Sequence, residues 1–163
     1  MNKVQISQVL KHVGRKVADQ NEQAILDEDE IQELEQLRLE VYDIIKTIKD
    51  PEEPGTLEEL EMITEDLVSV RKENGLPSIR IEWAPTNPEC KCALTIALCI
   101  RTKLFQQLSV QNAKIDIYIK EGKHSIKDQI DKQVNDKERV LAAMENENVV
   151  AVIADLIQEP KSH

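Results

Sequence analysis

The hydrophobic pattern predicts a folded body that begins with an amphipathic helix near Leu34. Apolar residues recur there at intervals of three and four, the spacing of a helix with one buried face. The positions are Leu34, Leu37, Val41, Ile44, Ile45 and Ile48. The helix should end at Asp50-Pro51, because the residue before a proline avoids the α region. A turn at Pro54-Gly55 and the capping-box spacing of Thr56 and Glu59 predict one short helical turn after it.

Two segments on either side of Asn74-Gly75 predict a β-hairpin. Residues 63–72 alternate in part between apolar and polar positions, and residues 78–83 alternate throughout. Asn-Gly is a strong signal for a two-residue hairpin turn. Because strand side chains alternate between faces, Ile79, Ile81 and Trp83 should share the buried face.

The second half of the chain predicts helices around one more strand. After an irregular loop with two prolines, residues 93–108 form a helix that is apolar around most of its circumference. Residues 114–120 alternate as a third strand. Ser125 and Asp136 are candidate N-caps for two further helices, and residues 149–157 form the last one. The expected class is α+β, with a small antiparallel sheet of three or four strands packed by helices, and with C-terminal helices.

The first 35 residues differ from the rest. Residues 1–18 carry bases and no acid in a helical apolar pattern, whereas residues 19–35 carry acids and no base. We expect residues 1–35 to be an amphipathic or disordered N-terminal arm and residues 36–160 to be a single α+β domain. The alternative for the basic stretch is an organelle transit peptide, although one Ser and one Arg are few for such a segment.

Charge and composition limit the kinds of partner that the chain can bind. The 163 residues include 21 Lys and Arg against 31 Asp and Glu, a net charge of −10, whereas nucleic-acid binding needs clustered bases. Four aromatic residues leave little material for stacking on bases. The longest apolar run, residues 92–100, is about half a bilayer span, so we expect no membrane partner. Three clustered cysteines are typical of a reducing compartment, which favours the cytoplasm.

Cys90 is the candidate reactive thiol. It follows the double-proline loop at the expected start of a helix, where the helix dipole stabilises a thiolate. An accessible, reactive sulfur is one interpretation, and a small apolar residue that closes the helix start is the other. The neighbouring Glu89 would oppose thiolate formation. Cys99 falls among apolar helix positions and is expected to be an inert core thiol.

A metal site can be drawn around the same cysteine. Cys90 and Cys92 form a Cys-x-Cys pair, and two thiols need further ligands to complete a tetrahedral zinc site. Glu89 and His124 could join Cys90 if the end of the third strand meets the proline loop; the alternative is an ordinary turn histidine. We find no other arrangement of catalytic residues and expect no enzymatic activity.

Three stretches resemble the cytosolic iron–sulfur assembly component 2 family, also called Galla-type or MIP18-like proteins. They are VYDIIKTIKDPEEPGTLEEL at 41–60, APTNPECKCALTIALCIRTKL at 84–104 and EGKHSIKDQIDKQVNDKERVLAAMEN at 121–146. The last is more similar to the type-A branch. The resemblance implies an α+β adaptor, not an enzyme, that joins a WD-repeat propeller and a helical-repeat scaffold. Such a complex delivers iron–sulfur clusters to cytosolic and nuclear apoproteins.

The resemblance also assigns residues. It places the family's reactive cysteine on Cys90 and its turn histidine on His124. Its Asp-Pro-Glu motif, which we expect to bind a partner, falls on Asp50, Pro51 and Glu52. This sequence departs from the family at two positions. Glu89 stands where the family usually has histidine, and Cys92 stands where it usually has an apolar residue. A transient iron–sulfur cluster or zinc is the cofactor that the resemblance leaves open.

A charged stripe near the C-terminal helices is the remaining candidate surface. It consists of Lys132, Asp136, Lys137, Glu138 and Arg139. Such a stripe is either a solvated helix face or, given the resemblance, the surface that binds the propeller.

Two other functions stay open, a thiol-dependent redox module with Cys90 as nucleophile and a scaffold in chromosome segregation complexes. The C-terminal helices could also exchange between chains in a domain-swapped homodimer.

Overall fold

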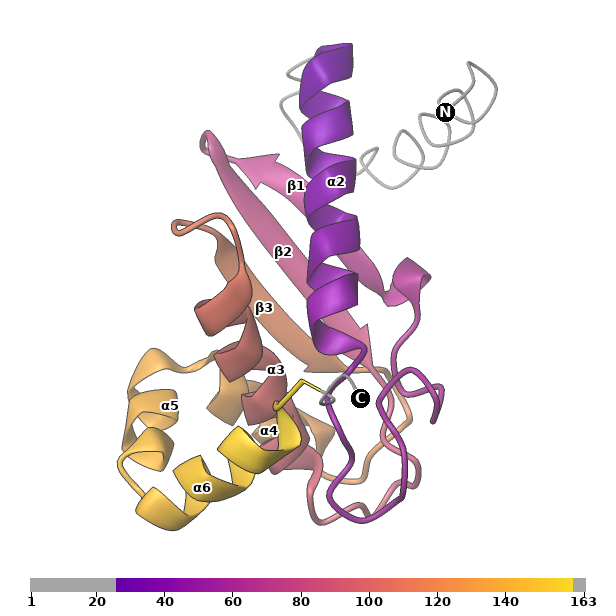
Figure 1. Cartoon of the computed structure of the whole chain (residues 1–163), viewed down its shortest axis with the longest axis vertical. Coiled ribbons are helices and arrows are strands. Elements are labelled where there is room, and N and C mark those ends of the chain that lie inside the picture. Colours follow the sequence, from indigo (N-terminus) through magenta and orange to yellow (C-terminus); the bar gives the residue numbers. More distant parts are fainter. Residues whose placement is uncertain (1–25, 160–163) are drawn as a thin grey trace.

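The computed structural model describes residues 26–159, so the expectations for residues 1–25 lie outside the described part. Its elements in chain order are α2 (Glu28–Ile45), η1 (Glu65–Leu67), β1 (Val68–Glu73), β2 (Leu76–Trp83), α3 (Ala93–Gln107), β3 (Lys114–Ile119), α4 (Lys127–Asn135), α5 (Lys137–Met144) and α6 (Glu147–Leu156) (Figure 1). Among the described helices, none has the length and apolar character needed to cross a bilayer.

Helix α2 begins earlier than the sequence pattern indicates. Asp27 caps it in a capping box, in which the Asp27 carboxylate accepts from the Glu30 backbone and the Glu30 side chain accepts from the Asp27 backbone. Three acids in the first turn, from Glu28 to Glu30, interact favourably with the positive end of the helix dipole. These acids, which the sequence pattern assigns to the N-terminal arm, are therefore the start of this helix, and the expected boundary at residue 35 falls inside it.

The hairpin forms around the predicted turn. Asn74 and Gly75 have φ values of 50° and 80°, as a type I′ turn requires, and β1 pairs antiparallel with β2. Ile79, Ile81 and Trp83 are all fully buried, which confirms their shared face. The first strand begins at Val68 rather than at residue 63, because the short helix η1 precedes it.

The third strand corrects one part of the fold prediction. The α+β class is confirmed, but β3 pairs parallel with β2, so the sheet is mixed rather than antiparallel. Parallel neighbours need a crossover connection, and α3 supplies it between β2 and β3. Both parallel strands therefore end at the same edge of the sheet, and the loop that carries Cys90 leaves from that edge.

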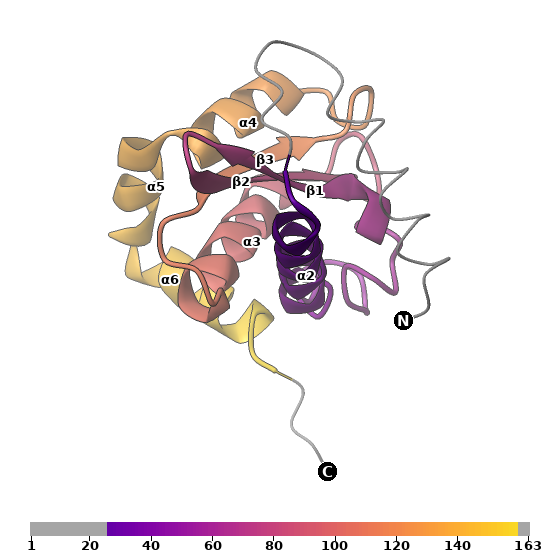
Figure 2. The same ribbon diagram turned by 90° about the horizontal axis from the view of Figure 1, so that it is seen from above.

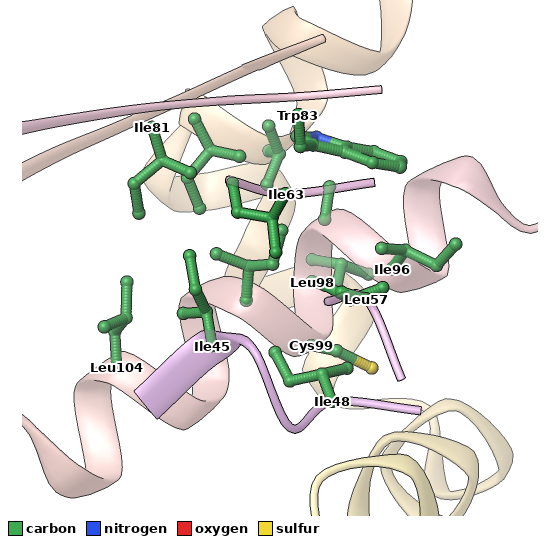
Figure 3. Close-up of a cluster of buried hydrophobic side chains, with 14 of the residues drawn as sticks. Ile45, Ile48, Leu57, Ile63, Ile81, Trp83, Ile96, Leu98, Cys99 and Leu104 are labelled. Carbon is green, nitrogen blue, oxygen red and sulfur yellow. The ribbon is translucent and has the colours of Figure 1, made fainter. Parts of the chain in front are cut away.

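Helix α3 is the centre of the hydrophobic core. Figure 2 shows α2 and α3 side by side on one face of the sheet, and Figure 3 shows residues of α3 packed with Ile48, Leu57 and Trp83. Cys99 lies fully buried in this cluster, as expected. Phe105 is an exception to the predicted apolar circumference, because it is 86% exposed. Lys103 is buried, and its ammonium group bonds to Thr47 and Glu159.

Side chains of α4 cover the free edge of β3. The Asn135 amide accepts from the backbone of Ile117 and donates to its carbonyl, and the Asp131 carboxylate accepts from the backbone of Ile119. Unpaired strand edges otherwise invite pairing with another chain. Asp136 caps α5 as predicted. Ser125 does not cap α4, which begins at Lys127 after Ile126 without a side-chain cap.

Candidate functional site

Three loops that are distant in the sequence meet beyond the ends of β2 and β3. They are residues 84–92 before α3, residues 120–126 after β3, and residues 49–57 after α2. The backbone of Ser125 donates to the Pro88 carbonyl at 3.0 Å, and the backbone of Lys120 donates to the Trp83 carbonyl at 2.8 Å. The end of the third strand thus meets the proline loop. The metal site predicted from the sequence around Cys90 requires this contact.

Cys90 lies at the centre of this region but is only 4% exposed. This corrects the expectation of an accessible surface thiol. The backbone N–H of Cys90 donates to the Asn87 carbonyl at 3.3 Å, which closes a turn in the proline loop. Helix α3 begins only at Ala93, after Cys92, so Cys90 precedes the helix rather than opening it.

Cys92 and Glu52 complete a group of metal-capable side chains. The sulfur of Cys90 lies 3.0 Å from that of Cys92, and a carboxylate oxygen of Glu52 joins them with all three donor atoms within 4.8 Å of one another. Cys90 is buried, Cys92 is half-buried and Glu52 is exposed, so the group extends from the interior to the surface. Within residues 26–159, this is the set of cysteine, histidine and acidic residues placed closely enough to share an ion.

The surroundings of Cys92 disfavour its thiolate. Burial raises the pKa of the Cys92 thiol well above its usual value, and the nearby Cys90, Asp50 and Glu52 raise that pKa further. Protein burial disfavours the charged form of a thiol, and negative neighbours act in the same direction.

His124 holds the proline loop in place. Its Nδ1 accepts from the Ile126 backbone at 3.2 Å, so the ring proton is on Nε2, which donates to the Cys90 carbonyl at 2.9 Å. Glu89 accepts a hydrogen bond from the Ser125 hydroxyl at 3.2 Å. The two residues proposed as metal ligands thus lie beside Cys90, and in this arrangement both bond to other partners.

Asp50 shapes the third loop from inside. One of its carboxylate oxygens accepts from the backbones of Glu52 and Glu53, each at 2.7 Å. The other oxygen is buried and has no hydrogen-bond partner within the described residues. Asp50 is 7% exposed, so within the Asp-Pro-Glu motif only Pro51 and Glu52 are exposed to solvent.

The charged stripe lies on the surface, as its composition suggests. Lys132, Lys137, Glu138 and Arg139 are exposed at the junction of α4 and α5. Asp136 has a structural task there, because its side chain accepts from the backbones of Glu138 and Arg139. The stripe is thus open to a partner, apart from the carboxylate that caps α5.

The sequence pattern pairs Cys90 with Cys92 but does not place Glu52 beside them. The Cys-x-Cys spacing indicates the two sulfurs, whereas the sequence assigns Glu52 only to partner binding. Its place beside the sulfurs depends on how the loop after α2 folds, and Asp50-Pro51 signals a turn there without saying what the turn approaches.

No family model matches the chain. Individual proteins do. "MIP18 family protein FAM96A" of Dictyostelium discoideum is 42% identical over 139 residues, covering 75% of this chain and 92% of the relative. "MIP18 family protein galla-1" of Drosophila melanogaster is 41% identical over 140 residues, covering 85% of this chain and 64% of that longer relative. "Cytosolic iron-sulfur assembly component 2B" of Dictyostelium discoideum is 35% identical over 130 residues, covering 80% and 77%.

Proposed function

The chain belongs to the MIP18 family, the cytosolic iron–sulfur assembly component 2 family, and from this premise we propose that it is an adaptor in cytosolic iron–sulfur protein assembly. The observation that carries the proposal is the similarity to the relative named for that assembly, over 77% of its length. A part this large includes most of the folded body, not a single shared motif. Assignment to the type-A branch stays a prediction.

The adaptor would act through two exposed surfaces. The charged stripe on α4 and α5 presents both signs of charge to solvent, which suits recognition of a partner with a complementary pattern. We assign this surface to a WD-repeat propeller. The loop with Pro51 and Glu52 lies beside Cys90 and Cys92. We assign this second surface to a helical-repeat scaffold or to the apoproteins that receive clusters.

Cys90 would act from its buried position beneath the second surface. Because it is buried, a client reaches its sulfur only where Cys92 and Glu52 open to solvent. The adaptor would work in the cytosol and also in the nucleus, where some recipients of clusters reside. Helices α5 and α6 follow short connections and could exchange between two chains to give a homodimer.

The test is affinity purification of the full chain from cytosol, with the iron–sulfur content of cytosolic enzymes measured in cells that depend on it. We expect a WD-repeat propeller to co-purify. Reversing two charges of the stripe, Lys137→Glu with Arg139→Glu, should abolish that co-purification. Arg71→Glu, which reverses an exposed charge on β1, is the matched control and should leave it intact.

Cys90→Ala separates delivery from assembly of the complex. We expect it to lower the cluster content of client enzymes while the propeller still co-purifies. Normal client clusters in cells that carry only Cys90→Ala would remove the proposed role of this thiol. Failure of any propeller to co-purify with the unaltered chain would remove the adaptor role.

The contact between the two sulfurs favours a second candidate, a redox module. Oxidation of Cys90 and Cys92 to a disulfide would release two electrons and two protons, which would reduce a partner's disulfide to two thiols. The raised pKa of Cys92 opposes this function, because the thiolate is the attacking species. Reduction of a model disulfide by the chain, lost in Cys92→Ala, would support the redox module over the adaptor.

A further inference from the structure

The group of Glu52, Cys90 and Cys92 has the composition of a metal site. Two sulfurs and one carboxylate oxygen lie within 4.8 Å of one another, a span that one ion can bridge. The donors come from two loops that the β1–β2 hairpin separates in the sequence, so no local turn requires them to converge. Thiolates select zinc and related thiophilic ions over magnesium or calcium.

Asp50 supplies a second, independent observation. Its free carboxylate oxygen is buried without a hydrogen-bond partner in the described residues, although buried polar atoms are nearly always satisfied. The other oxygen of the same carboxylate accepts from the backbones of Glu52 and Glu53, so Asp50 belongs to the loop that carries Glu52. A bound cation would offset the negative charges that gather there.

We propose that Cys90, Cys92 and Glu52 bind one thiophilic divalent cation of the zinc class, with a fourth coordination position open to solvent. Asp50 is a positioning residue, because its bonded oxygen holds the backbone of Glu52 while its free oxygen adds negative charge near the ion. Three protein ligands leave one position at which the ion can bind water or another molecule, whereas closed structural zinc sites use four protein ligands.

The sulfur spacing requires a small adjustment. The two sulfurs are 3.0 Å apart, whereas two thiolates on one tetrahedral zinc, each about 2.3 Å from the ion, lie about 3.8 Å apart. Cys92 is half-buried and stands at the N-terminal end of α3 without a side-chain cap bond. Rotation of its side chain can therefore open the pair without moving the core.

The donor set differs from the one built on Glu89 and His124. His124 already bonds to two backbone groups, and a metal at Nδ1 would have to displace the Ile126 N–H from that nitrogen. Cys92 needs no such exchange. The inference goes beyond the adaptor function and does not rest on it, since ion binding can be measured on the isolated chain.

Cobalt binding to the full chain tests the site. The protein is reduced with a phosphine, freed of metal with a chelator that is then removed, and titrated with Co²⁺, whose thiolate charge-transfer and ligand-field absorption reports sulfur ligands and four-coordinate geometry. We expect one Co²⁺ per chain with thiolate bands, displaced by Zn²⁺. Cys92→Ala should reduce the charge-transfer intensity by about half and weaken binding by at least tenfold, since even an outer-shell partner is worth about 10–100-fold.

Two matched pairs of variants keep the result specific. Glu52→Gln should keep the thiolate bands but weaken binding by about tenfold, whereas Glu53→Gln, its exposed neighbour, should change neither. Cys99→Ala removes a core thiol and should leave the bands intact, with circular dichroism confirming the fold. If Cys90→Ala fails to fold, the half-buried Cys92 still decides the question.

Three results would overturn the proposal. One is a reduced chain that gives no thiolate-to-cobalt band. Another is a band that Cys92→Ala leaves unchanged. The third is an equal loss of affinity in Glu52→Gln and Glu53→Gln, which would indicate general attraction to acidic residues rather than a ligand. Cys90 and Cys92 can be isolated as a disulfide, which is then reduced before the titration. If the reduced chain still binds no cobalt, the proposal is overturned.

Discussion

Cys99 and the pair of Cys90 and Cys92 share one short stretch of chain, yet the fold gives them different chemistry. Cys99 lies inside α3 among apolar side chains, and burial alone raises its pKa to about 12. Cys92 is also partly buried, but acidic side chains and a second sulfur contribute to its raised pKa. Burial by itself makes a thiol inert, whereas burial beside other donor atoms makes a group that an ion could bind.

The difference has a structural origin in the backbone. Around Cys99 the backbone groups bond within the helix, so only packing decides the environment. Around Cys90 the backbone bonds reach other loops, through His124 and through the contact of Ser125 with Pro88. The surroundings of Cys90 are therefore held by polar contacts between loops, and those of Cys99 by apolar packing.

The largest expected effect lies on the core side. Ile96→Ala, at a fully buried position of α3, should lower the free energy of unfolding by about 2–5 kcal/mol, because it leaves a cavity that the neighbours fill only in part. Urea unfolding measures the loss. Phe105→Ala on the same helix, at an exposed position, should change stability by less than about 0.5 kcal/mol. Equal losses in the two variants would mean that α3 is not buried on one side as described.

Cys99→Ser should lower the free energy of unfolding by about 1–3 kcal/mol, because it places a hydroxyl in an apolar environment. Cys92→Ser, at a half-buried polar position, should cost less than about 1 kcal/mol. Chemical unfolding at pH 7 compares the two. A larger loss for Cys92→Ser would reverse the assignment of core and loop thiols.

The cost of Cys99→Ser should also depend on pH. Cys99 stays protonated in the folded chain because its pKa is about 12, whereas its unfolded value is 9.0. Above pH 9 the unfolded thiol loses its proton and the folded thiol does not, so the unmodified chain loses stability as pH rises. Serine has no such ionisation, and the gap between the two proteins should shrink by about 1 kcal/mol from pH 8 to pH 10. A gap that stays constant over that range would mean that Cys99 is not protected by burial.

Asp50→Asn should affect only the loop thiol. Burial is the main cause of the raised pKa of Cys92, and removal of the smaller contribution of this buried charge lowers that pKa toward its usual value. In metal-free protein at pH 8, we expect alkylation of Cys92 to accelerate, while Cys99 stays unchanged. Mass spectrometry of the alkylated peptides measures both rates.

Glu53→Gln is the control for that experiment, since Glu53 is not among the groups that raise the pKa of Cys92. An equal acceleration at Cys99 would show that Asp50→Asn loosens the whole fold. In that case the acid would be structural rather than electrostatic in its effect on the thiol.

The smallest effect is expected at His124. His124→Ala removes the hydrogen bond to the Cys90 carbonyl and should lower the free energy of unfolding by about 1 kcal/mol. Faster alkylation of Cys90 should accompany the loss, because the proline loop is released. His124→Gln, which can still donate, should restore part of the stability; no recovery would indicate that ring packing rather than the hydrogen bond matters.

Much of the fold was predictable because its signals are local. The Asn74-Gly75 turn, the buried face with Ile81 and the cap at Asp136 each depend on a few neighbouring residues. The direction of β3 was not predictable from alternation, since a strand has the same pattern in either direction. The cap expected at Ser125 failed for a tertiary reason, because its backbone bonds to Pro88 and its hydroxyl to Glu89.

The sequence by itself determined the α+β class, the buried faces, the family and the residue types around Cys90 and Cys92. Periodicity, turn residues and motifs each depend only on residues that are close together in the sequence. Only the tertiary structure decided that Cys90 is buried, that His124 bonds to backbone and that Glu52 lies beside Cys92. Those facts depend on contacts between loops far apart in the chain, and the packing of α2 and α3 against the sheet brings these loops together.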